Sequence, residues 1–189
     1  MVKENINKKF IWQLKGEEPK YYTLDKLNRA IIESFELRKT KEKRQAESPY
    51  VDTTTKKLFV RTKHEEKWTE FPKNLLEEIK SKYTRPNNNY SAINSLKISN
   101  CGRVEINGDI KTQADESGKT GYLKVMGYPG LGMVYNLVAN TWIKKPDNYC
   151  SDCILDVHHI TNNGYDNRPE NLIWLKKCDH SRIDHKVNK

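Results

Sequence analysis

The sequence lacks the features that mark membrane proteins, secreted proteins and fully disordered chains. None of its apolar runs approaches the roughly 18 residues that a membrane-spanning helix needs. Its first nine residues contain no apolar stretch of the kind found in signal peptides. Aromatic residues make up 10% of the chain, with 4 Trp and 10 Tyr, which is enough to build a packed core. We therefore expect an intracellular, cytoplasmic protein that does not interact with a membrane.

Cysteine is also scarce, at only Cys101, Cys150, Cys153 and Cys178. In a chain of 189 residues without an export signal, so few cysteines do not predict the disulfide framework of a small secreted domain. Cys150 and Cys153 have the Cys-x-x-Cys spacing of metal sites. A structural zinc held by Cys150, Cys153, Cys178 and a fourth residue is therefore one interpretation, and reduced, partly buried thiols are the other.

Acidic residues are outnumbered, because 34 Lys and Arg face 25 Asp and Glu, for a formal net charge of +9. Residues 1–90 hold most of this excess, with 21 Lys and Arg against 14 Asp and Glu. The histidines show the opposite distribution, and all but one of the five lie at positions 158–185. Positive charge favours a polyanionic partner, although charge alone does not identify it. We expect the basic N-terminal region, residues 1–90, to bind DNA or a protein partner.

Periodicity in residues 1–90 predicts a mixed helical and β region that ends at a break over 85–89. The elements predicted there are a helix over 21–47, a strand or hairpin over 50–60 and a helix over 72–83. Thr23 can cap the first helix, and Leu27 and Ile31 belong to its buried stripe. Its basic end is either a solvated helix end or an arm that contacts phosphates, through Lys39, Lys41, Lys43 and Arg44.

The pattern after residue 91 is that of a β-hairpin-rich module followed by a histidine-rich end. Asn107-Gly108 between two apolar runs is a strong hairpin signal. A short helix is predicted over 136–143, with Leu137, Val138 and Trp142 facing inward. The predicted strands of the module cover 96–98, 104–106, 121–126 and 133–135.

Residues 155–185 have a strand, loop, strand and helix layout, and they hold four of the histidines. His158 and His159 end the first strand, where neighbouring side chains point to opposite faces. The two rings are therefore suited to different tasks: one can bind a metal together with His180, and the other can accept a proton from water. Hydrolysis of a phosphodiester needs both tasks, because a cation stabilises the developing charge while a base activates water.

This stretch resembles the HNH, or ββα-metal, endonuclease motif. Val-His-His-Ile at 157–160 is similar to its first histidine block, and Asn163–Leu172, with Asn-Arg-Pro-Glu-Asn-Leu, is similar to its middle block. His180 lies nine residues after Asn171, where the last metal ligand of the family is expected. Upstream, 98–104, 121–125 and 135–142 resemble the β-rich NUMOD-type module of phage and intron-encoded homing endonucleases.

The resemblance implies roles for the matching residues. His159 would be the general base, and Asn171 would hold the loop that orients it. His158 and His180 would bind one divalent cation, Mg²⁺ or Mn²⁺, with Asp184 as an added ligand from the same helix face as His180. The family often has Asp at the position of His158, and many members have a second zinc-binding cysteine pair that is absent here. Phosphate contacts are expected from Arg168, Lys176, Lys177 and Arg182.

The sequence therefore predicts an α+β protein, with a basic region over 1–90 and a β-hairpin module plus HNH nuclease domain over 91–189. Its expected function is metal-dependent cleavage of double-stranded DNA, of the homing or phage-encoded type, by a monomer, a homodimer or a complex with a partner protein. Two alternatives stay open: a phage genome-processing or branched-DNA nuclease, and a DNA-binding protein that keeps the HNH scaffold without activity.

Overall fold

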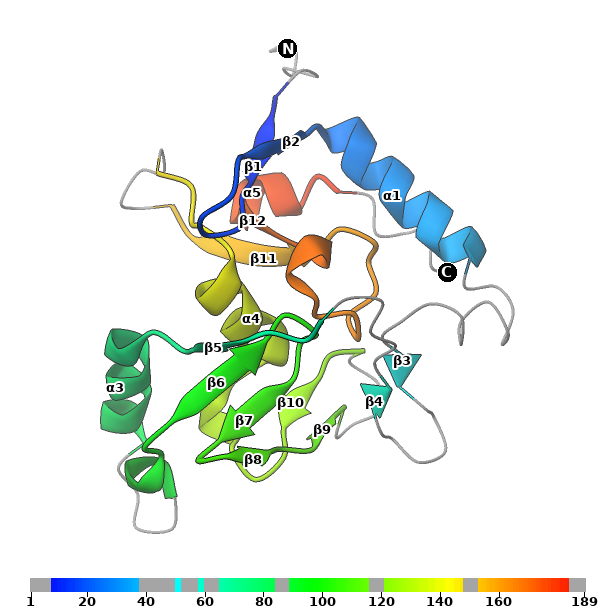
Figure 1. The fold of residues 1–189 in the computed structure, drawn as a ribbon. Helices are drawn as coiled ribbons and strands as arrows, with labels where there is room; N and C mark the ends of the chain where they lie inside the picture. The colour runs from blue at the N-terminus through cyan, green and yellow to red at the C-terminus, as the bar shows by residue number, and fades with distance from the viewer. Residues whose placement is uncertain are drawn as a thin grey trace.

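A computed structural model describes residues 8–37, 50–51, 58–59, 65–83, 89–115, 121–147 and 153–183. Short helices and small antiparallel sheets alternate along the chain, so the protein is α+β as predicted (Figure 1). Within these residues, no helix combines the length and the apolar character that crossing a membrane requires.

The N-terminal elements are a β-hairpin followed by one long helix. Strand β1 (Phe10–Trp12) pairs antiparallel with β2 (Lys20–Tyr22), and α1 (Leu24–Leu37) follows. The prediction of a helix from residue 21 is wrong, because residues 21 and 22 are bonded to β1 in the hairpin. Thr23 is the predicted cap, since its Oγ1 accepts a hydrogen bond from the backbone N–H of Lys26 at 3.3 Å. The rest of the predicted helix, 38–47, lies outside the described residues.

The two other elements predicted in residues 1–90 are confirmed where the structure describes them. Strand β3 (Tyr50–Val51) pairs antiparallel with β4 (Leu58–Phe59), as expected for a hairpin. Helix α3 (Lys73–Lys82) occupies the range predicted to be helical. The basic arm at 39–44, for which phosphate contacts were proposed, is outside the described residues.

A four-stranded antiparallel sheet forms the centre of the β module, in the order β5-β6-β7-β8 (Figure 1). Its strands are β5 (Trp68–Glu70), β6 (Leu96–Ser99), β7 (Val104–Ile106) and β8 (Asp109–Ile110). The predicted Asn-Gly turn joins β7 to β8, and both of its residues have positive φ. Strand β5 was not predicted; it precedes the break at 85–89 and pairs with β6, which follows that break.

The segment after the sheet differs from the prediction at two strands. Strand β9 (Gln113–Ala114) was not predicted; it pairs with β10 (Lys124–Val125), which lies inside the range predicted as a strand. The strand predicted over 133–135 is wrong, because Met133 makes only an isolated bridge to β10 and Val134 begins helix α4 (Val134–Trp142). The backbone N–H of Val134 donates to Leu123 O at 2.9 Å, which fixes the start of this helix against β10.

The C-terminal elements have the predicted strand, loop, strand and helix layout. Strand β11 (Leu155–His159) pairs antiparallel with β12 (Leu172–Lys176), and α5 (Lys177–His180) follows directly. Helix α4 contacts β5 and β6 of the sheet as well as β11 and β12 of this hairpin, so it lies between the two units (Figure 1). The described part of the chain also contains three short 3₁₀ helices, at Asn89–Ala92, Pro129–Leu131 and Pro169–Asn171.

Two apolar cores hold these elements together, and each contains residues from both sides of the break predicted at 85–89. In the first core, Phe71 and Leu76 pack with α4, the sheet and Leu172 of β12. In the second core, β1 and α1 pack against Ile173 and Leu175 of β12. The two faces of β12 are thus covered by different parts of the chain. The described parts of 1–90 and 91–189 therefore share their cores.

Candidate active site

The β11–β12 hairpin places His158 opposite Ile173 and His159 opposite Leu172. Because adjacent strand residues alternate between faces, the two imidazole rings meet different neighbours, as predicted. His158 Nδ1 lies 3.3 Å from His180 Nε2, whereas His159 Nε2 lies 2.9 Å from Asn167 Oδ1. The structure thus brings His158 and His180 together and turns His159 away from them.

The His158–His180 pair joins the end of β11 to the short helix α5. Its ring centroids are 5.1 Å apart, and His158 is 2% exposed, so the pair lies at the protein surface only through His180. On the other side of its ring, His180 Nδ1 donates to Asp156 Oδ2 at 3.5 Å. A proton on Nδ1 leaves the lone pair of His180 on Nε2, the atom that faces His158. A carboxylate behind a histidine in this way is typical of the second layer of a metal site.

The separation of the two ring nitrogens fits a shared cation. Two ligands that are each about 2.1 Å from one metal ion lie roughly 3.0–3.4 Å apart, and the observed distance is 3.3 Å. Among the described residues, no group of three or more His, Cys, Asp or Glu side chains is placed to hold a metal. The described residues therefore offer two imidazole nitrogens, which suit first-row transition cations better than Mg²⁺, a cation that prefers oxygen ligands. Asp184, the added ligand predicted from the sequence, lies outside the described residues.

His159 is held in a narrow, largely apolar setting. Its ring packs against those of Tyr122 and Tyr135, with centroid distances of 5.6 and 5.2 Å, and the two tyrosine rings also contact each other at 5.5 Å. Only 4% of the residue is exposed. Burial lowers the pKa of His159 from its usual 6.5 to about 4, and the hydrogen bond with Asn167 opposes that change only partly. The ring is therefore neutral near pH 7, which is the form that can accept a proton.

Asn167 decides which nitrogen of His159 can accept that proton. A side-chain amide oxygen only accepts hydrogen bonds, so Nε2 of His159 must donate to Asn167 Oδ1. The lone pair of the ring is then on Nδ1. Asn167 is 1% exposed and packs closely against Gly102. A Cβ added to Gly102 would lie within 3.2 Å of the backbone and Cβ of Asn167. Gly102 also has φ +78°, so the tight turn between β6 and β7 supports Asn167 from behind.

Asn171 fastens both ends of the loop between β11 and β12. Its Oδ1 accepts from the backbone N–H of Thr161 at 3.0 Å, and its Nδ2 donates to Asp166 O at 2.8 Å. Its backbone O also accepts from Ile160 N at 2.7 Å. The loop passes so close to Gly121 O and the Tyr122 ring that a Cβ at Gly164 would clash with both. These contacts hold the loop that carries Asn167 against the end of β11.

The predicted phosphate contacts have different surroundings. Arg168 is half-buried, and its Nε and a terminal nitrogen donate to the two oxygens of Asp166 at 2.8 and 2.7 Å. Lys177 and Arg182 are exposed on and just after α5, and Lys176 is half-buried at the end of β12. Arg182 also lies 3.9 Å from Asp179. Arg168 therefore has its guanidinium occupied by a carboxylate, whereas Lys177 presents its charge to solvent.

The described cysteines are not grouped with other possible ligands in a way that would hold zinc. Cys153 is half-buried, Cys178 is exposed on α5, and Cys101 is buried in the turn between β6 and β7. Cys150 lies outside the described residues. No cluster of possible metal ligands includes the described cysteines. The zinc interpretation therefore stays a prediction from sequence spacing.

Four residues next to the histidines were not singled out from the sequence. Asp156 precedes His158 by two positions, so strand alternation could have placed both side chains on one face. Asn167 belongs to the matched middle block, and Tyr122 and Tyr135 belong to the matched upstream stretches, but the resemblance assigned no role to any of the three. Their contact with His159 depends on tertiary packing.

Comparison of the chain with family models, curated proteins and solved structures gives no match in any of the three sets.

Proposed function

We propose that this chain is a metal-dependent endonuclease of the HNH type, which hydrolyses phosphodiester bonds in DNA. The observation that supports it most is the division of adjacent histidines on one hairpin. His158 meets His180 at a distance suited to one cation, and His159 is turned to a separate amide that fixes its tautomer. Phosphodiester hydrolysis needs a cation site and a separate base of this kind.

His158 and His180 would hold a divalent cation, Mg²⁺ or Mn²⁺. When bound, that ion supplies positive charge that stabilises the phosphate oxygens as negative charge develops on them. The chain's own part is to present Nδ1 of His158 and Nε2 of His180 toward one point. Asp156 keeps His180 in the orientation and tautomer that this requires.

His159 is the proposed general base, and its free lone pair is on Nδ1. It takes a proton from the attacking water, and the positive ring that results keeps its Nε2–H bond to Asn167. Asn167 is thus a positioning residue, because it fixes the tautomer of His159 rather than contacting the phosphate. Asn171 acts one step further away by fastening the loop on which Asn167 lies.

The proposed substrate is double-stranded DNA, and the net charge of +9 suits such a polyanion. Exposed Lys177 and Arg182 lie three residues before and two residues after His180 in the sequence and are candidates for phosphate contacts. One site cuts one strand in each encounter, so a monomer would nick and a homodimer would cut both strands. A cytoplasmic location and a homing or phage origin belong to the same proposal.

Relaxation of supercoiled plasmid DNA tests this function. We expect nicking in Mg²⁺ or Mn²⁺ and none in EDTA, and we expect His159→Ala to lower the cleavage rate by at least about a hundredfold, the usual contribution of a general base. His64→Ala is the matched control, because it removes the one histidine that is far from the motif in the sequence.

A His159→Ala protein that remains folded and cuts at the wild-type rate would contradict the mechanism. A wild-type protein that binds DNA but never cuts it, with any divalent cation, would instead favour a DNA-binding protein on the HNH scaffold.

A further inference from the structure

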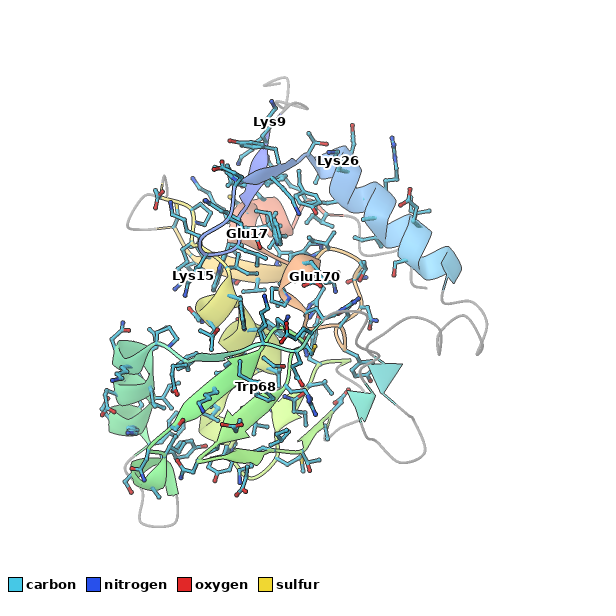
Figure 2. All side chains as sticks on the ribbon, viewed as in Figure 1. Lys9, Lys15, Glu17, Lys26, Trp68 and Glu170 are labelled. Atoms are coloured by element: carbon cyan, nitrogen blue, oxygen red, sulfur yellow. The ribbon has the colours of Figure 1, made fainter. Side chains whose placement is uncertain are left out.

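An open surface hollow of about 530 Å³, the β2–α1 cavity, lies between β2 and α1, away from the histidines. Its volume is in the range of small-molecule sites, roughly 300–1,000 Å³. The walls are mainly carbon, and the rim carries charged side chains. Figure 2 shows one of these, Lys26, at the start of α1 next to β2. Neither the cation site nor the proposed base uses this cavity.

The rim of the cavity is positively charged. Lys20, Lys26 and Arg29 line it, against a single acid, Glu33. Lys26 and Arg29 are exposed, and neither forms an ion pair within the part of the chain that the structure describes. The ammonium of Lys20 lies 4.7 Å from the ring centre of Trp12. An anion at this rim would therefore meet cations that are not already neutralised by carboxylates.

The walls of the cavity are aromatic. Tyr21 and Tyr22 line it, and Tyr21 is 50% exposed. Lys9 Nζ lies 5.8 Å from the centre of the Tyr21 ring, on the same hairpin. A phosphate alone would need cations but no aromatic wall. A nucleotide combines a planar base, which stacks on such rings, with a phosphate that pairs with Lys and Arg.

The β1–β2 hairpin and α1, which form the cavity, are attached to the β11–β12 hairpin and α5. Lys8 Nζ donates to both oxygens of Asp179 at 2.7 and 2.6 Å, and Asp179 directly precedes His180. Trp12 Nε1 donates to Pro169 O at 3.1 Å, and the second core joins β1 and α1 to β12. Whatever binds in the cavity is therefore held at a constant position relative to His158 and His180.

We propose that the β2–α1 cavity binds a nucleotide of an unpaired DNA strand, with its base on Tyr21 and its phosphate at Lys26 and Arg29. Bases in a duplex are stacked on one another and present no free face to a tyrosine, so only an unpaired strand fills such a pocket. This inference rests on the proposed nuclease function and adds to its duplex substrate a preference for DNA in which an unpaired strand lies beside the duplex.

Fluorescence anisotropy of the full chain in EDTA tests the cavity without cleavage. Three fluorescein-labelled probes are compared: an oligothymidylate strand, a blunt duplex of the same length, and a duplex with a single-stranded overhang. We expect Tyr21→Ala to weaken binding of the strand and of the overhang duplex by at least about fivefold, from loss of stacking on one base. Affinity for the blunt duplex should stay within about twofold. Tyr21→Phe keeps the ring and should bind as the wild type does.

Arg29→Ala is a second variant that does not depend on β2. It should weaken binding of the strand and reduce the dependence of that binding on salt. Lys73→Ala is its matched control, because Lys73 is an exposed cation on α3, at the other end of the molecule from α1 (Figure 1). Melting temperatures of all variants show whether each remains folded.

Two results would overturn the proposal: Tyr21→Ala and Arg29→Ala binding the strand as Lys73→Ala does, or a loss that is equal for the strand and the blunt duplex. Either result leaves plasmid cleavage, and hence the proposed nuclease function, untouched. Conversely, a chain that shows the expected selectivity but never cuts DNA would lack the proposed nuclease function and still have the cavity site.

Discussion

At the scale of single residues, His159 is the most constrained titratable group of the candidate site. It is buried against two tyrosines, and its hydrogen bond to Asn167 is to an amide oxygen that can only accept. These surroundings favour the neutral ring, because a charged imidazolium would lose hydration without gaining a carboxylate partner. The same feature that suits a general base therefore makes the folded state sensitive to acid.

We predict that His159 makes the protein less stable as the pH falls. Its pKa is about 4 in the folded chain and near 6.5 when unfolded, so the unfolded state takes up the proton first. The contribution of the neutral ring is complete above about pH 6.5 and is lost as the pH falls toward about 4; it amounts to on the order of 3 kcal/mol. Urea unfolding of the wild type and of His159→Gln in EDTA measures it.

Because carboxylates also titrate in this range, the comparison between the two proteins decides the result. The variant should lose distinctly less stability than the wild type between about pH 7 and pH 4. Equal losses would show that His159 is not the group responsible.

At the scale of elements, α5 depends on its neighbours for its place. It spans only Lys177–His180, which is too short to be stable in isolation. Besides the contacts of His180 with β11, the backbone N–H of Lys177 donates to Ile154 O, buried Ile183 follows in the second core, and Lys8 binds Asp179. Asp179 is 3% exposed, so its carboxylate depends on these cations for compensation.

We predict that Lys8→Met destabilises the chain by about 1–3 kcal/mol, because it leaves the buried Asp179 carboxylate with only the more distant Arg182. The disturbance is next to His180, so Mn²⁺ binding, followed by electron paramagnetic resonance, should weaken as well. Lys8→Arg keeps the charge and should restore most of both properties. Lys73→Met serves as the control for loss of one exposed lysine.

Unchanged melting temperature and unchanged Mn²⁺ affinity in Lys8→Met would mean that the ion pair does not position α5.

At the scale of the whole molecule, β12 is the element on which both cores depend. Leu172 and Trp174 belong to the core shared with the sheet and α4, whereas Ile173 and Leu175 belong to the core shared with β1 and α1. A strand that is buried on both faces couples the units that cover it. The N-terminal hairpin and α1 are therefore a structural part of the hairpin that carries the histidines.

We predict that a cavity made in α1 weakens β12 as well. Leu27 is fully buried, and Leu27→Ala should lower the free energy of unfolding by about 2–5 kcal/mol. Amide hydrogen exchange at Ile173 and Leu175 should speed up to match that loss, since the chain unfolds as one unit. Ile32→Ala on the exposed side of the same helix is the control, because Ile32 is 48% exposed.

Faster exchange confined to α1, with β12 protected as in the wild type, would show that the two parts unfold independently.

Local patterns were enough to predict the elements that depend on neighbours in sequence. Strand alternation placed His158 and His159 on opposite faces, the Asn-Gly pair formed its turn, and Thr23 capped α1. Each of these outcomes is set by backbone geometry within a few residues. The resemblance to a nuclease motif likewise depends on residue spacing alone, and it stays a proposal.

The tertiary structure decided what depends on residues far apart in the chain. It pairs β5 with β6, ends the predicted strand at Met133, and sets Asp156 behind His180. It also chooses Asn167 as the partner of His159 and joins Lys8 to Asp179 across 171 positions. These contacts depend on how both cores pack around β12. The energy of that packing comes from many side chains that lie far apart in the sequence. A short stretch of sequence does not contain all of these side chains. The sequence alone therefore determined the hairpin and its histidines, and the tertiary structure determined their surroundings.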